Sequence, residues 1–338
     1  MKSIVLPPLS LLYGAVTRTR LSLYRRGTFQ TTKLDRPVIS IGNIIAGGTG
    51  KTPLVEYVAR LLAAQGKKVC ILTRGYGRKD AHLQVIVSDG YGVLASPSEA
   101  GDEPYLLATR LKGMAAVISS ADRIAAGREA IKDFGTECFV LDDGFQHLRL
   151  ARDLNIVTID ATNPWGGRRL LPHGRLRESL DGMRRADCVV ITRCDQVESV
   201  GQLREEITRL TDGRPVFESQ MRMERVSSLK NGGEAIEAPK RVAAFCGVGN
   251  PAAFFSQLRQ EEYEVTSEKA FPDHHVYSQE EIDLLIKETR AEALITTAKD
   301  AVKLRSLSFS IPCFVSEIEM EIEGAEEFAS LVIEAVKA

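Results

Sequence analysis

The sequence predicts an α/β fold in which a mostly parallel sheet is covered by helices on both faces. Three observations carry this prediction. Short, continuous apolar runs alternate with helical stretches along the 338 residues, which is the pattern of strands buried on both faces. A glycine-rich segment at 46–52 lies between one such strand and a helix. Another apolar run, at 138–141, ends in two aspartates, and ligands bind at the carboxyl edge of such sheets.

The predicted elements follow one another in a regular order. Strands are expected at 37–41, 68–72, 84–87, 115–118, 138–141, 155–159 and 188–192, and helices at 52–65, 102–112, 121–133 and 200–211. The alternation weakens around 213–240 and then resumes with strands at 242–245 and 293–296 and a last helix near 324–337. We therefore expect an N-terminal segment at 1–36, a core domain at 37–225 and a smaller C-terminal α/β lobe at 226–338.

Composition and charge narrow the class of protein. Hydrophobic residues make up 44% of the chain and charged residues 26%, which is ordinary for a soluble globular enzyme. The formal net charge of -1 argues against a general nucleic-acid binder. The 6 cysteines include no CxxC pair, so we expect free buried thiols rather than disulfides or a metal site. No apolar run approaches the length of a membrane span, and no signal-peptide cleavage pattern is present.

The first 36 residues differ from this average in their charge. They hold seven basic residues against a single acidic one, Asp35. A helix that begins after Pro7-Pro8 and continues to about Arg26 places apolar side chains along one side, namely Leu9, Leu12, Tyr13, Val16, Leu23 and Tyr24. A basic amphipathic helix of this kind either lies on an anionic membrane surface or packs on the protein's own core.

The strongest chemical pattern is the sequence Ala-Gly-Gly-Thr-Gly-Lys-Thr at 46–52. In a phosphate-binding P-loop, glycines let backbone N–H groups turn around phosphate oxygens at the start of a helix. The lysine neutralises the β- and γ-phosphates, and the following hydroxyl binds Mg²⁺. The usual pattern has glycine where this chain has Ile45, although the glycine pair supplies comparable flexibility. The predicted phosphate-binding residues are Gly47, Gly48, Thr49, Gly50, Lys51 and Thr52.

Asp142 and Asp143 follow the apolar run at 138–141. Two carboxylates at the end of a buried strand are costly unless a cation or hydrogen-bond donors compensate them. A capping role for one of them is the alternative, but together with the P-loop they predict an enzyme that uses a nucleoside triphosphate and a bound metal. This pair of motifs leaves open whether the enzyme hydrolyses the nucleotide or transfers a phosphate.

Phosphoryl transfer needs an acceptor site and a group that prepares the acceptor hydroxyl. Asp102 and Glu103 open a predicted helix, where they either act in such a site or cap the helix. His274 and His275 lie together in a loop beside an aspartate. Two further loops are rich in arginine, at 74–78 and 168–178, and they either bind an anionic substrate or form solvated basic faces.

Taken in order, these motifs resemble those of the tetraacyldisaccharide 4'-kinase family, the lipid A pathway kinases of Gram-negative bacteria. The string Asp-Asp-Gly-Phe-Gln-His at 142–147 is highly specific. The other matching segments are 42–43, 47–53, 74–77, 101–104, Pro-x-Gly-x-Leu-Arg-Glu at 172–178, 271–275 and Thr-x-Lys-Asp at 297–300. The resemblance implies ATP, Mg²⁺ and transfer to the 4'-hydroxyl of tetraacyldisaccharide 1-phosphate. It also implies a peripheral protein on the cytosolic face of the bacterial inner membrane, with the N-terminal helix facing that membrane.

The resemblance also implies roles for single residues. Lys51 and Thr52 would hold phosphate and metal, and Glu103, Asp142 and Asp143 would complete the metal site. Asp102 would form a catalytic pair with His274, or alternatively with His275, and Arg123 would stabilise the transferred negative charge. The residues expected around the acceptor are Arg74, Tyr76, Gln146, Arg177 and Glu178. The chain departs from the family pattern in the substrate loop, at His173, Arg175 and Ser179.

Two rival functions belong to other classes. The segment 192–195, Thr-Arg-Cys-Asp, follows a strand and weakly resembles a guanine-reading loop, as in a regulatory NTPase. A non-enzymatic membrane adaptor would use the basic N-terminus, but the intact P-loop and the two aspartates argue against it.

Overall fold

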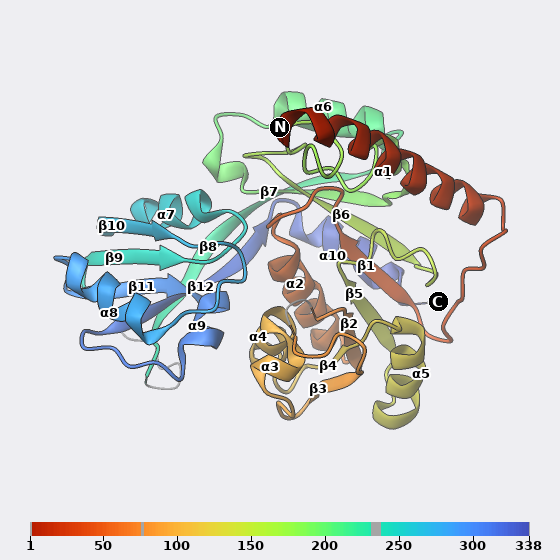
Figure 1. The fold of residues 1–338 in the computed structure, drawn as a ribbon. Helices are drawn as coiled ribbons and strands as arrows, with labels where there is room; N and C mark the ends of the chain where they lie inside the picture. Colours follow the sequence, from red (N-terminus) through yellow and green to blue (C-terminus); the bar gives the residue numbers. More distant parts are fainter. Residues whose placement is uncertain (1, 76–77, 231–237, 338) are drawn as a thin grey trace.

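The computed structural model describes residues 2–75, 78–230 and 238–337, and in this part of the chain a twelve-stranded sheet runs through two lobes (Figure 1). The strand order is β10-β9-β11-β12-β8-β7-β6-β1-β5-β2-β4-β3. Neighbouring strands are parallel except for β8 with β12 and β3 with β4. The predicted fold class, a mostly parallel sheet with helices, is therefore confirmed.

The core lobe contains the strands and helices that the alternating pattern predicted. Its strands are β1 (Val38–Gly42), β2 (Val69–Thr73), β3 (Val85–Asp89), β4 (Ala115–Ser119), β5 (Cys138–Asp142), β6 (Leu154–Asp160) and β7 (Cys188–Thr192). Its helices are α2 (Lys51–Ala64), α3 (Pro97–Ala100), α4 (Asp102–Arg110), α5 (Arg123–Phe134) and α6 (Gly201–Leu210), with short 3₁₀ turns η1 (Leu180–Arg185) and η2 (Cys194–Gln196). Every residue of β1, β2, β4, β5 and β7 is buried, which explains their continuous apolar sequences.

The longest strand, β8 (Val216–Ser228), links the two lobes. Its first residues pair with β7, and the rest pairs with β12 (Cys313–Ile322). This strand lies within 213–240, where the alternating pattern weakens and where the sequence predicted no strand. Buried residues are interrupted along it by partly exposed and exposed ones, so it has no continuous apolar run. The predicted boundary after residue 225 falls inside β8, and the division into domains stays a prediction.

The second lobe consists of the rest of β8 with β9 to β12 and the helices that connect them. Its other elements are β9 (Arg241–Cys246), α7 (Pro251–Gln260), β10 (Glu264–Ala270), α8 (Gln279–Glu288), β11 (Ala293–Thr297) and α9 (Ala298–Leu304). The last helix, α10 (Ala325–Glu334), returns to the core lobe. There the ring of Phe328 packs 5.2 Å from that of Phe217 and 6.0 Å from that of Tyr57 on α2.

Helix α1 (Lys2–Arg25) lies along the edge of the core lobe (Figure 1). It begins before Pro7-Pro8 and not after them, so the predicted start was wrong. Ser10 Oγ donates to the Leu170 carbonyl at 3.0 Å, and Tyr13 OH donates to the Arg177 carbonyl at 2.9 Å. These bonds fix one face of α1 on the loop that holds Leu170 and Arg177.

The opposite face of α1 is apolar and exposed. The exposed fractions are 44% for Leu9, 77% for Leu11, 62% for Leu12 and 58% for Val16. The predicted stripe is therefore split, because Tyr13 contacts the protein while its leucine and valine neighbours face solvent. Within the described residues, we find no helix that combines the length and hydrophobicity needed to cross a membrane.

Candidate active site

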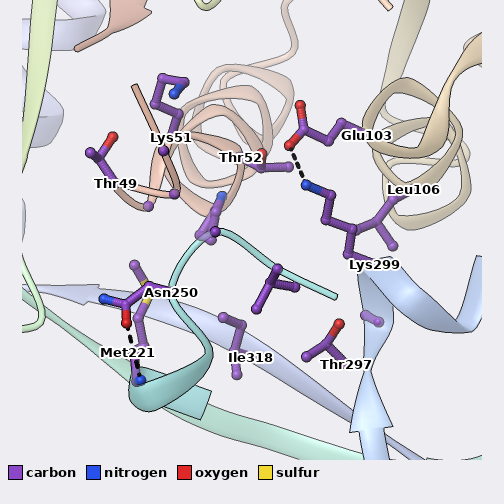
Figure 2. Close-up of a pocket in the computed structure, with 18 of the residues that line it drawn as sticks. Thr49, Lys51, Thr52, Glu103, Leu106, Met221, Asn250, Thr297, Lys299 and Ile318 are labelled. Atoms are coloured by element: carbon purple, nitrogen blue, oxygen red, sulfur yellow. Dashed lines mark hydrogen bonds and ion pairs between the residues drawn. The ribbon is translucent and has the colours of Figure 1, made fainter. Parts of the chain in front are cut away.

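A cavity of about 280 Å³ lies between the P-loop of the core lobe and the second lobe (Figure 2). The P-loop and the start of α2, residues 47–53, form one wall, and residues 248–250 and 297–299 form the other. Strands β5 and β11 end beside it, at Asp142 and Thr297. The cavity therefore lies at the carboxyl edge of the sheet, where the sequence predicted a ligand.

The P-loop has the backbone conformation that its glycines allow. Gly47 has φ 128° and Gly50, directly before α2, has φ 78°, both in the region that favours glycine. Thr49 Oγ1 accepts a hydrogen bond from Asn43 Nδ2 at 2.7 Å and lies 2.8 Å from Thr158 Oγ1. The Thr49 side chain therefore fastens the loop to the sheet, which leaves its backbone N–H for phosphate.

Ile45, which stands where the usual P-loop pattern has glycine, is 3% exposed and pairs with Leu176 in an isolated β-bridge. Arg175, a departure from the family pattern, donates from Nε to the Ala46 carbonyl at 2.8 Å. Both departures thus join the P-loop to the loop at 168–178. This contact has no local sequence signal, because its two halves are 129 residues apart.

Asp142 and Asp143 differ in their electrostatic surroundings. Burial and the nearby carboxylates of Glu103 and Asp143 raise the pKa of Asp142 to about 6. Burial also acts to raise the pKa of Asp143, but Lys51 and Arg177 outweigh it and hold that pKa below its usual range. Arg177 Nη1 lies 2.8 Å from both Asp143 oxygens, and Lys51 Nζ lies 3.6 Å from Asp143 Oδ1.

These surroundings fit a hard cation such as Mg²⁺. Asp142 is 3% exposed, and the negative charges of Glu103 and Asp143 act on it. A divalent cation would relieve the repulsion among these carboxylates. Thr52 and Asp142 both line the cavity. Mg²⁺ is commonly held by one or two carboxylates together with nucleotide phosphates. Within the described residues, no group of three or more His, Cys, Asp or Glu side chains is arranged to hold a metal by itself.

The loop between β10 and α8 places a histidine beside Asp102. His274 Nδ1 lies 3.3 Å from Asp102 Oδ2, whereas His275 Nε2 lies 3.0 Å from both carboxylate oxygens of Glu281. Of the two histidines left open by the sequence, His274 is thus the one that contacts Asp102. Burial acts to raise the pKa of Asp102, but the hydrogen bond from His274 and the charge of Lys303 hold it below its usual range.

Lys299 of α9 has no role in the sequence prediction, yet it lines the cavity. Its Nζ lies 3.1 Å from Glu103 Oε1 (Figure 2) and 3.2 Å from Asp273 Oδ1. Glu103, predicted as a metal ligand, is therefore paired with a lysine in this structure. The available signal for Lys299 was its place in the Thr-x-Lys-Asp motif directly after a strand.

The remaining predicted residues divide into two groups. Arg74 and Arg177 line the cavity, and Tyr76 lies outside the described residues. Gln146 donates to Glu178 at 2.8 Å, and Glu178 is 3% exposed and binds both terminal nitrogens of Arg185. Gln146 and Glu178 are thus behind Arg177 and are not among the described residues that line the cavity.

Arg123 is also placed behind the cavity. It is 5% exposed, and its Nη2 donates to the backbone carbonyl of Asp142 at 3.3 Å. Its Nη1 lies 3.5 Å from His147 Nδ1. In this structure Arg123 therefore supports the end of β5, where the metal-binding carboxylates are expected.

A glycine-rich loop that opens a helix, beside a strand ending in acidic residues on a parallel sheet, defines a P-loop NTPase-like nucleotide-binding protein. The chain matches the family model of tetraacyldisaccharide-1-P 4'-kinase over residues 2–337. It belongs to this family, and the resemblance found in its motifs is confirmed.

Similar proteins cover nearly the whole chain. The tetraacyldisaccharide 4'-kinase of Geobacter metallireducens is 42% identical over 313 residues, which cover 89% of this chain and 88% of the relative. That of Syntrophus aciditrophicus is 39% identical and covers 99% and 93%, respectively. The crystal structure of LpxK from Aquifex aeolicus in complex with ATP has a TM-score of 0.78 at 35% identity, and the match covers 97% of this chain and 98% of that one.

Proposed function

We propose that this protein is an ATP-dependent kinase that phosphorylates the 4'-hydroxyl of tetraacyldisaccharide 1-phosphate in lipid A biosynthesis, with Mg²⁺ as its metal. One observation supports this proposal above the others. The P-loop of the core lobe and His274 of the second lobe line the same cavity, and His274 contacts Asp102. A phosphate donor bound to the P-loop and an acceptor hydroxyl beside His274 would therefore lie in the same cavity.

The core lobe supplies the phosphate-binding half of the site. Backbone N–H groups of the P-loop and the start of α2 would bind the phosphates, and Lys51 would offset their charge. Thr52, Asp142 and Asp143 would hold Mg²⁺, which neutralises charge on the transferred group when bound. Lys51 and Arg177 already stand beside Asp143, so the positive charge is in place before a reaction begins.

The Asp102–His274 pair would prepare the acceptor. The 4'-oxygen forms a bond to the γ-phosphorus of ATP, and the bond from this phosphorus to the β–γ bridging oxygen breaks. The proton of the hydroxyl passes to the Asp102–His274 pair, and ADP leaves. Most of the rate acceleration in such a transfer comes from positioning and charge stabilisation, which agrees with a site built from two opposed walls.

The acceptor is a lipid, and α1 is suited to contact the membrane in which it resides. Its exposed leucines form an apolar surface, and the first 36 residues carry a basic excess. Each basic residue near an anionic membrane contributes about 1 kcal/mol. The other face of α1 is bonded to Leu170 and Arg177, so the membrane-facing helix adjoins the proposed acceptor loop.

The test of this function is transfer of radiolabelled γ-phosphate from ATP to tetraacyldisaccharide 1-phosphate in detergent micelles. Label on the lipid, absent with Asp102→Ala, would support both the reaction and the role of Asp102. Release of free phosphate that does not depend on the lipid would contradict the kinase function and favour a regulatory NTPase.

A further inference from the structure

The segment that follows β7 contacts the P-loop directly. Thr192 Oγ1 donates to the Thr49 carbonyl at 3.2 Å, and Arg193 Nη1 donates to the Gly48 carbonyl at 3.1 Å. Two successive residues therefore hold two successive carbonyls of the P-loop. Arg193 has φ 59°, a left-handed conformation that is uncommon for a residue with a long side chain. This is the segment whose sequence weakly resembles a guanine-reading loop.

The geometry of the peptide bond gives these contacts a functional meaning. A trans peptide is planar, with its C=O and N–H pointing in opposite directions. A donor that fixes the Gly48 carbonyl therefore also fixes the direction of the Thr49 N–H. Such N–H groups are the donors with which a P-loop binds phosphate. We propose that Arg193 is a positioning residue that holds the P-loop in its phosphate-binding conformation and couples this conformation to the second lobe.

The coupling runs through Asp160, at the end of β6. Its buried carboxylate forms an ion pair with Arg193. The same oxygen, Oδ2, accepts from Asn250 Nδ2 at 3.1 Å, and the other oxygen accepts from the Thr162 backbone N–H at 3.0 Å. Asp160 is thus held on several sides and gives Arg193 little freedom to turn away from Gly48.

Asn250 belongs to the second lobe, where its Oδ1 accepts from Ala253 N at 3.3 Å and caps α7. Figure 2 shows it on the segment that approaches the P-loop near Thr49. A Cβ on the preceding Gly249 would lie 2.6 Å from Gly48 N, so the two backbones approach as closely as glycine allows. Gly48, Arg193, Asp160 and Asn250 therefore form one continuous connection from the P-loop to the second lobe.

Base reading does not explain this arrangement. In a guanine-reading loop the acidic residue would face the bound base, but Asp195 is exposed and is not among the described residues that line the cavity. Arg193, in contrast, does line it. A structural ion pair between Arg193 and Asp160 is the remaining alternative, and it would affect stability without distinguishing phosphate from nucleoside.

The test compares the affinities of Arg193→Met for ATP and for adenosine by isothermal titration calorimetry. Loss of one charge-assisted hydrogen bond predicts ATP binding weakened about tenfold or more, while adenosine affinity stays within about twofold of wild type. Arg193→Lys should restore part of the ATP affinity. Arg204→Met removes an exposed ion pair with Glu218 and serves as the matched control, with both affinities unchanged.

A second variant tests the coupling between the lobes, and it keeps the inference testable if Arg193→Met does not fold. Asn250→Ala should weaken ATP more than adenosine, and its effect should not add to that of Arg193→Met in the double variant. Equal loss of ATP and adenosine affinity, additive effects, or unchanged ATP affinity in Arg193→Met would each overturn the inference. This inference rests on the proposed use of ATP. The two are tested separately, because failure of the wild-type protein to bind ATP would contradict the proposed function, whereas the outcomes above contradict only the inference.

Discussion

Arg110, at the end of α4, is bonded to Glu56 of the P-loop helix α2, with 2.7 Å between Arg110 Nε and Glu56 Oε2. The same guanidinium lies 2.7 Å from Glu224 of β8 and 3.0 Å from Glu317 of β12. Burial acts to lower the pKa of Arg110, but the three carboxylates outweigh it and raise that pKa. One largely buried cation therefore joins the P-loop helix, the helix that begins with Asp102 and the strands that enter the second lobe.

We expect Arg110→Met to be strongly destabilising, because it leaves several partly buried carboxylates without their shared cation. Removal of one partner from a buried ion pair costs about 3–5 kcal/mol in the free energy of unfolding, which urea denaturation would measure. Arg60→Met is the matched control. Arg60 binds the same Glu56 at 2.7 Å but its side chain is 41% exposed, so its loss should cost less than about 1 kcal/mol. Equal losses would show that Arg110 does not join the lobes energetically.

Lys51 and Asp102 should separate nucleotide binding from turnover. Asp102→Ala removes a residue that contacts His274 but does not line the cavity among the described residues. We expect its ATP affinity to stay within about threefold of wild type while turnover falls about 10²–10⁴-fold. Lys51→Ala should lose both, because Lys51 belongs to the phosphate-binding wall. Calorimetry with ATP and the radiolabel transfer assay measure the two effects. Equal losses of ATP affinity would refute this division of roles.

The elements that the sequence predicted well are those whose signal is local. Strands β1 and β5 are buried throughout and therefore read as continuous apolar runs. The P-loop is recognised because its glycines, lysine and threonine act at fixed spacing next to a helix start. Strand β8 was missed because one of its faces is polar, and its partner β12 follows almost a hundred residues later.

Contacts between the lobes were not predictable in the same way. The pairs that carry them, such as Lys299 with Glu103, join residues far apart in sequence. The choice between His274 and His275 depends on the backbone, because His274 has φ 61°. This turn directs one ring to Asp102 and the other to Glu281. A single sequence gives little signal for such a turn, since residues other than glycine adopt the left-handed conformation only occasionally.

The apolar face of α1 predicts how the protein should bind vesicles. Leu12 is 62% exposed, so Leu12→Glu should fold normally. Burial of a leucine side chain contributes about 1.5–3 kcal/mol, and its replacement by an anionic residue should weaken binding to anionic vesicles about tenfold or more. Co-sedimentation with vesicles that contain anionic lipid would measure this change.

The control for α1 is Leu94→Glu. Leu94 is 61% exposed and follows β3, which lies at the opposite end of the core lobe from α1 (Figure 1). Leu94→Glu adds the same charge at an equally exposed leucine, so this variant tests whether the loss of vesicle binding is specific to α1. If both variants bound vesicles equally well, the membrane role of α1 would have to be abandoned.

His147 predicts a pH dependence of stability. Burial and the neighbouring Arg123, Arg152, Arg149 and Arg20 lower its pKa to about 3, whereas the unfolded chain has a histidine pKa of about 6.5. Between these values the unfolded state binds the extra proton and the folded state does not. The contribution of His147 to stability is therefore fully present above pH of about 6.5 and falls by about 1.4 kcal/mol per unit as the pH decreases below it.

His147→Gln removes this titration while keeping a polar side chain of similar reach. The quantity to compare is the free energy of unfolding of wild type minus that of His147→Gln, because the contributions of other groups cancel in this difference. As the pH is lowered from about 6 to about 5, the difference should decrease by about 1.4 kcal/mol. Urea denaturation at several pH values would measure the difference. His82→Gln, at an exposed histidine, controls for the loss of an imidazole as such. A constant difference for His147→Gln as well would mean that the folded protein admits a proton on His147, and that the arginines around it do not keep the ring neutral.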